Sequence, residues 1–458
     1  MTTQNFLCYN ENQLILVIWG YKMKKRLLVA VLTIIIFEFT AVAGVFLYIL
    51  FSSQNASFNM SNADIKAPED IEAFKESKLN VNNSHDIVAD IQISKNTILI
   101  TQTINFDKPS KKLYAYVNSD STAETSIKKV ASSTGNLSFL KKDTVLEISS
   151  GSSESSVIVE YEITLGNGRS TLTHMDNRYF LTNFLITPGV YKKDVLVRPY
   201  KSTLGDPYIY SSVSYYVIIK ADKSLDVFAP AQKEEHIFGA NKITILEAAN
   251  MRDFPIVIAE ASSVSKVAYG DIDIFYINSS ETAGYVKKAM DFAQKNIGKY
   301  PYPSFFVVKA PITQNGMEFS GMIFLSDLCF ENKDYLKTLT YHEVLHQWFY
   351  GIIGTDQINE PFLDEGLVTY LSEIPDGGYI SKPLFSGISS RKFLGRALGN
   401  YSSREEYYRL AYNDSALYFY NIHKKLGNNF YKLLNKIYED KKFKMLYFED
   451  FLSYASNY

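Results

Sequence analysis

The chain has 458 residues, of which 46% are hydrophobic, and its 47 Lys and Arg residues nearly balance its 49 Asp and Glu residues. That length favours two or three domains with sizeable cores, and an aromatic fraction of 14% excludes a disordered chain. The near-neutral net charge argues against a nucleic-acid partner, and two cysteines are too few for a disulfide framework.

The first element in the chain is an apolar run over residues 27–51, which is long enough to cross a bilayer as one helix. A basic cluster at positions 22–26 precedes the run, whereas residues 52–63 carry no charge. The positive-inside rule then places residues 1–26 in the cytoplasm and the chain after the span outside it. We therefore expect a single-pass membrane anchor with an extracytoplasmic remainder.

A cleaved signal peptide is the competing interpretation of this segment. Ala41, Val42 and Ala43 form the small-x-small pattern of a cleavage site. Cleavage there would leave the apolar stretch 45–51 as a free N-terminus, which favours an uncleaved anchor. Both Met1 and Met23 remain candidate starts, because Met23 directly precedes the basic cluster.

Two regions follow the span. Residues 52–80 are polar and predict a linker that leads away from the membrane. Residues 81–265 contain short alternating runs separated by Gly, Asn, Ser and Asp, which predict an antiparallel β-sandwich domain. The clearest of these runs cover residues 90–93, 97–101, 156–161 and 214–219.

The pattern changes after residue 265. Residues 266–375 predict a mixed α/β unit, and helical periodicity continues through residues 376–458. Strands are expected at residues 272–276, 304–309 and 322–325, with a helix at about 282–297. The predicted fold class is therefore an α+β multidomain protein with a helical C-terminal part.

The segment from His342 to His346 reads H-E-x-x-H. On a helix the two histidines lie one turn apart and face the same way, so that they can share one Zn²⁺. Glu343 can then reach the open position of the metal as a general base. Zinc needs a third protein ligand, and Glu365 follows His346 after eighteen residues. We expect one zinc ion per chain.

This spacing resembles that of the gluzincin metallopeptidases of the M1 aminopeptidase family. The segment Gly316-Met317-Glu318 is similar to the middle of the family's G-x-M-E-N exopeptidase motif, with Asn315 and Phe319 departing at its two ends. Three further segments have family counterparts, and the resemblance covers about residues 85 to 435. They are Gly205-Asp206-Pro207, Arg252-Asp253-Phe254 and Tyr300-Pro301-Tyr302-Pro303. The resemblance implies that residues 266–375 form a thermolysin-like catalytic domain.

The resemblance also implies roles for individual residues. His342, His346 and Glu365 would bind zinc, and Glu343 would act as the general base. Glu318 would bind the free α-amino group of the substrate. Gly316 and Met317 would line the path of the substrate backbone.

A tyrosine stabilises the oxyanion in this family, usually within Y-x-K-G. The best match here is Tyr412, although Asp414 and Ser415 replace the family's Lys and Gly. The other tyrosines near this position are Tyr407, Tyr408 and Tyr418. For Asp364, beside Glu365, two interpretations stay open: it orients a ligand histidine, or it caps a helix.

The sequence thus predicts a membrane-anchored zinc metallopeptidase that faces outward, most simply an aminopeptidase acting on peptides. Larger family members carry a long C-terminal helical domain, for which little chain remains after Tyr412. An open-cleft peptidase without strict N-terminal preference is therefore one alternative. A non-catalytic zinc-binding surface module is another, and the intact Glu343 argues against it. The sequence leaves the oligomeric state and the side-chain specificity open.

Overall fold

The structure, a computed structural model, describes residues 68–81, 84–117, 122–200, 202, 204–377 and 392–458. Within these ranges, no helix is both long enough and apolar enough to cross a membrane. The predicted cytoplasmic segment 1–26 and the predicted span 27–51 lie outside the described residues.

The end of the predicted linker is not an extended spacer but a helix, α3 (Pro68–Val81). Ile71 of α3 is buried against Val88 and Tyr216 of the neighbouring sheet. The Lys75 ammonium is buried as well, and its Nζ lies 2.7 Å from Asp90 Oδ2. Because an apolar contact and an ion pair both attach α3 to the sheet, this helix is part of the β domain.

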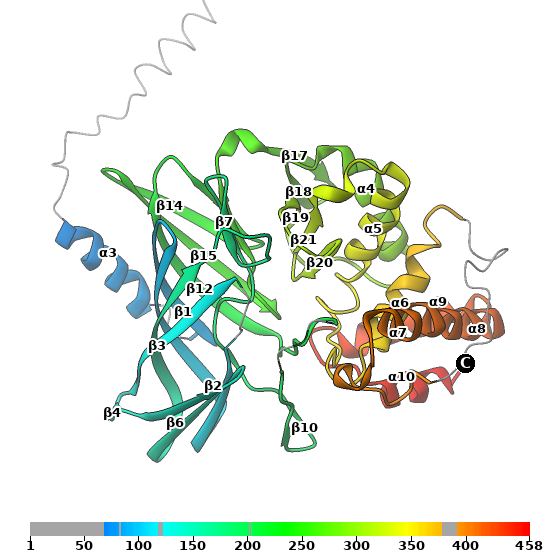
Figure 1. The fold of residues 1–458 in the computed structure, drawn as a ribbon, viewed down its shortest axis with the longest axis horizontal. Coiled ribbons are helices and arrows are strands. Elements are labelled where there is room, and N and C mark those ends of the chain that lie inside the picture. Colours follow the sequence, from blue (N-terminus) through cyan, green and yellow to red (C-terminus); the bar gives the residue numbers. More distant parts are fainter. Residues whose placement is uncertain (1–67, 82–83, 118–121, 201, 203, 378–391) are drawn as a thin grey trace, which may run out of the picture. The chain divides into compact units, whose positions relative to one another are not determined.

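A ten-stranded sheet forms most of that domain, in the order β14-β15-β12-β1-β2-β6-β3-β4, with β5 beside β6 and β9 beside β2 (Figure 1). Its strands are β1 (Ile87–Ser94), β2 (Thr97–Tyr116), β3 (Ala123–Ser132), β4 (Gly135–Asn136), β5 (Ser138–Lys142), β6 (Val145–Leu165), β9 (Thr187–Pro188), β12 (Val213–Asp222), β14 (Gln232–Phe238) and β15 (Asn241–Met251).

A four-stranded sheet packs on it, in the order β13-β16-β8-β7, and β10 and β11 form a separate ribbon. Alternate residues of β1, such as Ile87 and Ile91, share one buried core with Leu181 of β8 and Ile256 of β16. The bounds are β7 (Thr173–Met175), β8 (Arg178–Leu181), β10 (Tyr191–Lys192), β11 (Val195–Leu196), β13 (Asp226–Phe228) and β16 (Ile256–Ala259).

The expectation of a wholly antiparallel sandwich is wrong in one place, because β1 pairs with β12 in parallel. Local alternation shows which residues face the core, but it carries no information about the direction of a partner strand that lies more than a hundred residues away. The remaining pairs of this sheet are antiparallel.

A five-stranded sheet, in the order β17-β18-β19-β21-β20, forms the core of the second region. The middle strands β18, β19 and β21 are parallel, and β17 and β20 are antiparallel edge strands. The bounds are β17 (Val264–Tyr269), β18 (Ile272–Ile277), β19 (Ser304–Ala310), β20 (Gly316–Phe319) and β21 (Met322–Ser326). The strands predicted at 272–276, 304–309 and 322–325 correspond to β18, β19 and β21.

Helices make up most of the remainder. They are α4 (Ala283–Asn296), α5 (Lys333–Leu345), α6 (Phe362–Ser372), α7 (Arg404–Tyr407), the π-helix η6 (Tyr408–Asp414), α8 (Ser415–Leu426), α9 (Asn429–Lys441) and α10 (Phe448–Ala455). Helix α5 contacts α4, strands β20 and β21, and helix α6. This arrangement places α5 between the edge strand β20 and helix α6 (Figure 1).

Arg252, after β15, ties the β domain to segments far along the chain. Its guanidinium is buried and donates hydrogen bonds to the carbonyl oxygens of Tyr210 at 2.9 Å, Tyr350 at 2.6 Å, Ile352 at 3.2 Å and Lys444 at 2.8 Å. Burial lowers the pKa of Arg252 to about 10. The four carbonyl dipoles supply the acceptors that this buried cation requires.

Asp253 joins two parts of the second region. Its Oδ1 accepts a hydrogen bond from the backbone N–H of Ser320 at 2.7 Å, and its Oδ2 accepts one from the Tyr350 hydroxyl at 2.8 Å. One buried carboxylate therefore fixes the end of β20 relative to the segment that follows α5.

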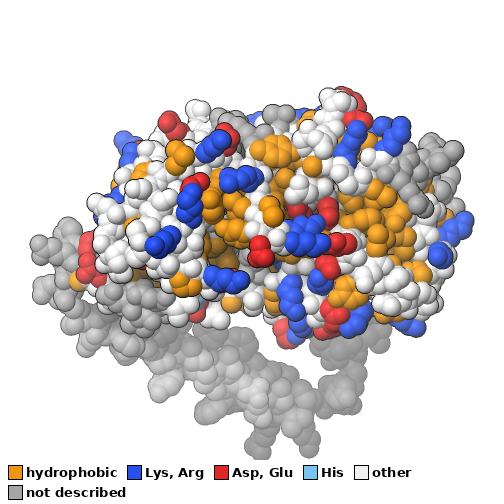
Figure 2. Space-filling model, turned by 90° about the horizontal axis from the view of Figure 1, so that it is seen from below, with side chains coloured by type: hydrophobic (Ala, Val, Ile, Leu, Met, Phe, Trp, Pro, Cys, Tyr) orange, Lys and Arg blue, Asp and Glu red, His pale blue; other side chains and the backbone are white. Residues whose placement is uncertain are grey.

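The surface shown in Figure 2 carries basic and acidic side chains that are interspersed, with hydrophobic side chains between them. This distribution agrees with the formal net charge of -2.

Candidate active site

Helix α5 carries the H-E-x-x-H segment, and local signals explain where it begins. The side chain of Asn332 caps the helix by accepting a hydrogen bond from the N–H of Tyr335, and Asp334 in the first turn suits the helix dipole. The helix ends at Leu345, so that His346 is its C-terminal cap and not an interior residue.

His342 and His346 meet the carboxylate of Glu365, which lies in the first turn of α6. Their two Nε2 atoms are 3.0 Å apart, and Glu365 Oε2 lies 3.3 Å from that of His342 and 3.5 Å from that of His346. One potential ligand atom of each residue lies within 4.8 Å of the others. The structure thus brings together the three residues that the sequence predicts as zinc ligands.

The donor set fits a zinc ion. A tetrahedral zinc at about 2.0–2.2 Å from each ligand holds those ligand atoms about 3.3 Å apart, close to the separations found here. His346 Nδ1 lies 3.1 Å from the carbonyl oxygen of Phe349, a partner that fixes the proton on Nδ1. The lone pair of Nε2 is then directed toward His342 and Glu365, where a cation can accept it.

The carboxylates of the site differ in their electrostatics. Burial raises the pKa of Glu365, but its close contacts with the rings of His342 and His346 bring it down to about 2. Burial raises the pKa of Glu318 to about 7. Burial and the neighbouring charge of Glu365 together raise the pKa of Asp364 to about 7. Glu365 is therefore the carboxylate that stays ionised beside the histidines.

Glu343 is buried on the same helix, and its Oε2 has no hydrogen-bond partner within the described part of the chain. Burial raises the pKa of Glu343 well above its ordinary value, and the neighbouring charge of Glu318 adds to the shift. A carboxylate with a raised pKa and a free oxygen is suited to accept and return a proton.

Strand β20 presents Glu318 toward α5. This carboxylate is only 3% exposed, and its Oε1 accepts a hydrogen bond from Gln357 Nε2 at 2.8 Å. Met317 projects to the other side, because its side chain packs with Phe319 in the core of the sheet. Of the two residues expected to line the substrate path, Gly316 lies beside Glu343 and Met317 can contribute only its backbone.

Tyr412 lies beside the histidines. Its ring centroid is 6.0 Å from that of His342, and the two rings are inclined by 18°. It belongs to the π-helix η6, a kind of irregular turn that often occurs at functional sites. Tyr418, one of the other candidate tyrosines in this part of the sequence, packs against Phe393 and Phe448.

Asp364 is bound at the start of α6. Its Oδ1 accepts a hydrogen bond from the N–H of Glu365 at 2.9 Å, and its Oδ2 accepts one from Thr355 Oγ1 at 2.7 Å. These bonds hold the backbone of Glu365 within the first turn of α6. Neither bond goes to a ligand histidine, and the N-cap of α6 is Pro361, so they support neither of the two interpretations.

Two polar residues at the site carry no predicted role in the sequence. Gln357 binds Glu318, and Asp206 lies close enough to be affected by the charges of Glu318 and Glu365, which together with burial raise its pKa well above the usual value. Gly205, beside Asp206, faces the Tyr407 hydroxyl so closely that a β-carbon there would lie 2.3 Å from it. The only sequence signal was the Gly-Asp-Pro triplet, which marks a turn and indicates no role.

No family model and no curated protein matches the sequence. The fold, however, is similar to that of solved M1 peptidases. A crystal structure of an M1 zinc metallopeptidase from Deinococcus radiodurans matches with a TM-score of 0.57 and 13% identity, over 81% of this chain and 89% of that one. A mutant of that enzyme bound to a Tyr-Ser-Ala substrate matches with a TM-score of 0.58 and 12% identity, over 81% and 89% of the two chains.

Native yeast LTA4 hydrolase matches with a TM-score of 0.56 and 14% identity, over 81% of this chain and 64% of that one. The expected multidomain α+β architecture with a helical C-terminal part is thus the fold found in M1 peptidases.

Proposed function

We propose that the protein hydrolyses peptide bonds with one zinc ion held by His342, His346 and Glu365. The observation that carries this proposal is the cluster of three ligand atoms within 4.8 Å, next in sequence to Glu343, whose Oε2 has no hydrogen-bond partner among the described residues. The M1 peptidase fold supports the same reaction class.

A zinc ion bound at these ligands supplies a Lewis acid that lowers the pKa of water and polarises a carbonyl group. Glu343 would accept a proton from the attacking water at Oε2 and return it to the leaving amine. Tyr412, whose ring lies beside that of His342, would donate a hydrogen bond from its phenol to the negative charge that develops on the carbonyl oxygen.

Removal of N-terminal residues is the most direct form of this activity. Glu318 is a buried carboxylate beside the metal ligands, and a substrate ammonium would be an oppositely charged partner for it. Gln357 holds Glu318 Oε1, and Oε2 would make that contact. We propose that Glu318 and Gln357 together bind the α-amino group.

The first experiment measures zinc content together with hydrolysis of an amino-acid amide and of an N-acetylated peptide. An aminopeptidase contains one zinc per chain and hydrolyses the substrate with a free amino group much faster than the acetylated one. Equal hydrolysis of both substrates would indicate an open-cleft peptidase, and bound zinc without hydrolysis would indicate a non-catalytic module.

The second experiment tests Glu318 directly. A charge-assisted contact is worth roughly 1.5–3 kcal/mol, so Glu318→Gln should lower kcat/KM for free N-termini by about 10- to 100-fold. Hydrolysis of an acetylated peptide of the same sequence should hardly change. Glu281→Gln, on an exposed carboxylate, is the matched control. A loss of equal size on both substrates would exclude the assigned role.

We further propose that residues 27–51 anchor the enzyme in a membrane and that its catalytic part faces outward. The apolar run and the preceding basic cluster support this arrangement. Protease added to intact cells should digest the catalytic part, and protection from that protease would contradict the proposed orientation.

A further inference from the structure

The loop of residues 311–315 leads from β19 directly into Gly316 and Glu318 of β20. Its backbone is held from two sides. The carbonyl oxygen of Pro311 accepts a hydrogen bond from the N–H of Ser170 at 2.9 Å, and that of Asn315 accepts one from the N–H of Ser326 at 2.8 Å.

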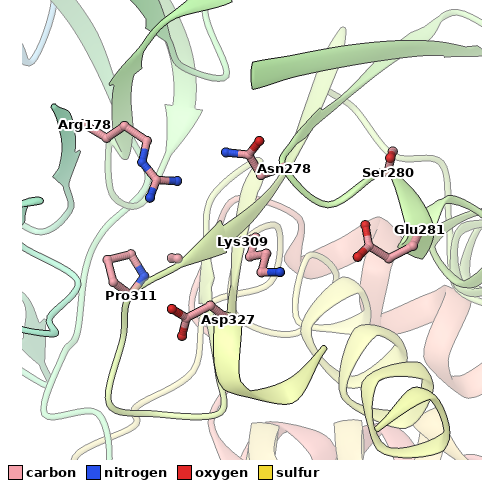
Figure 3. A pocket seen from close by; sticks show the side chains of 8 residues that line it. Arg178, Asn278, Ser280, Glu281, Lys309, Pro311 and Asp327 are labelled. Carbon is pink, nitrogen blue, oxygen red and sulfur yellow. The ribbon is translucent and has the colours of Figure 1, made fainter. Parts of the chain in front are cut away.

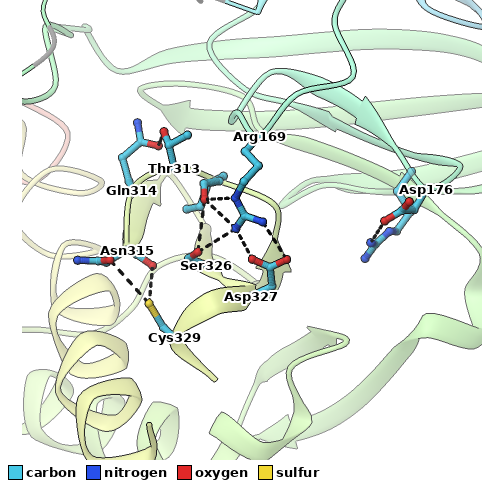
Figure 4. Close-up of polar contacts among 10 residues, drawn as sticks. Arg169, Asp176, Thr313, Gln314, Asn315, Ser326, Asp327 and Cys329 are labelled. Carbon is cyan, nitrogen blue, oxygen red and sulfur yellow. Dashed lines mark hydrogen bonds and ion pairs between the residues drawn. The ribbon is translucent and has the colours of Figure 1, made fainter. Parts of the chain in front are cut away.

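Arg169, next to Ser170 in the β domain, binds the same loop and the end of β21 (Figure 4). Its Nε and Nη2 donate hydrogen bonds to the carbonyl oxygen of Ile312 at 3.2 and 3.0 Å. Nη2 also donates to Ser326 Oγ at 3.2 Å, and the guanidinium forms a two-atom ion pair with Asp327. Hydrogen bonds from Arg169 hold the pKa of Asp327 below its usual value.

This guanidinium therefore joins the start of the loop to the end of the strand that pairs with β20. Its side chain is 32% exposed and that of Asp327 is 38% exposed. An ion pair so accessible to water adds little to global stability. Its contribution is geometric, because a planar guanidinium fixes several acceptors in one plane.

A neighbouring cation provides a contrast. Arg178 lines a surface cavity of about 510 Å³ together with Lys309, Pro311 and Asp327 (Figure 3). The polar contact of Arg178 is an ion pair with exposed Asp176, at 3.4 Å from Nη2 to Oδ2. Arg178 thus shares the charge and the surroundings of Arg169 but forms no bond to residues 311–315.

The position of β20 matters because Gly316 lies against Glu343. A displacement of about 1 Å in a reacting group can cost about 10²-fold in rate. We propose that Arg169 is a positioning residue: by fixing residues 311–315, it places Gly316 beside Glu343 and Glu318 where the substrate amino group binds. This inference rests on the proposed function for its kinetic consequences, but its structural content is independent of turnover.

The test compares Arg169→Ala, Arg169→Lys and the control Arg178→Ala by kinetics. Arg169→Ala should raise KM for substrates with a free N-terminus by about 10-fold and reduce the preference over acetylated peptide, with unchanged zinc content. Arg169→Lys retains the charge but cannot bind Ile312, Ser326 and Asp327 in one plane, so a smaller effect in the same direction is expected. Arg178→Ala should behave as the wild type.

Hydrogen exchange supplies a readout that needs no activity. Amides of residues 312–319 should exchange faster in Arg169→Ala than in the wild type or Arg178→Ala, while the rest of the chain is unchanged. Wild-type KM together with wild-type hydrogen exchange over residues 312–319 in Arg169→Ala would overturn the proposal. If Arg169→Ala does not fold, Asp327→Asn tests the same ion pair by changing the partner of Arg169.

An inactive wild type would contradict the proposed function. Faster exchange in Arg169→Ala that is confined to residues 312–319 would still support the positioning role of Arg169.

Discussion

The backbone of Gly316 lies against the carboxylate of Glu343, so that a β-carbon at position 316 would be 2.1 Å from Oε1. Strand β20 and helix α5 can approach this closely only because position 316 has no side chain. The exopeptidase-like segment and the predicted general base are therefore in direct steric contact.

Gly316→Ala should for this reason displace the Glu343 carboxylate without disrupting the fold. The atoms that the new β-carbon would meet are the end of the flexible Glu343 side chain. We expect kcat to fall by about 10²-fold while zinc content and melting temperature stay close to wild type. Gly284→Ala in α4 is the matched control, since a β-carbon there meets no atom within 4 Å. Full activity of Gly316→Ala would show that Glu343 tolerates displacement.

Glu343→Gln should abolish turnover while zinc stays bound, because Glu343 is adjacent to a ligand and is not itself part of the ligand group. Loss of a general base costs at least roughly 10²-fold. Rates with an amino-acid amide, measured beside metal content, test this assignment. Unchanged hydrolysis by the pure variant at wild-type zinc content would rule it out.

Glu365→Ala should lower zinc affinity sharply, since two histidines alone leave the ion without its third protein ligand. Metal content after dialysis against a mild chelator is the measurement. Glu373→Ala, at the opposite end of α6, is the control and should retain zinc. Stoichiometric zinc in Glu365→Ala would mean that another residue completes the site.

His423 in α8 provides a pH-dependent prediction away from the zinc ligands. Its ring is buried and stacks on Phe430 at 4.5 Å, and burial lowers its pKa from 6.5. The unfolded chain therefore takes up a proton at higher pH than the folded one. The stability that the neutral ring contributes is present above about pH 6.5 and is lost as the pH falls through the lowered pKa.

The measurement is the melting temperature of wild type and His423→Gln between pH 7.5 and 5. The melting temperature of the wild type should fall more on acidification than that of the variant, because the variant has no group to titrate at this position. Loss of zinc at low pH affects both proteins alike, so the difference between them isolates His423. Parallel curves would contradict the prediction.

Much of this site could be predicted from the sequence because it depends on short-range periodicity. The four-residue spacing of His342 and His346 specifies one helical face, and the residues around Glu365 favour a helix start. The orientation of Met317 was missed, because a motif does not show which side of an edge strand faces the core. The packing of Met317 and Phe319 in the core of the sheet determines that.

Other features depend on contacts between distant parts of the chain. Gln357 and Asp206 come from irregular segments, which have no periodicity that would point to Glu318. The parallel pairing of β1 with β12 and the helix α3 depend on packing against strands that follow much later. Local propensity cannot specify such partners.

The four carbonyl partners of Arg252 have a consequence for how such a protein can be divided. A fragment that ended soon after residue 252 would keep Tyr210 but lose the other three carbonyl acceptors of this cation, and a fragment that began there would lack part of the sandwich. A chain cut before Lys444 would lose one of the four acceptors and leave the guanidinium short of partners in an apolar interior. The β domain and the helical end are therefore not interchangeable modules, and recombination between homologues at their border would succeed only where both halves retain this junction.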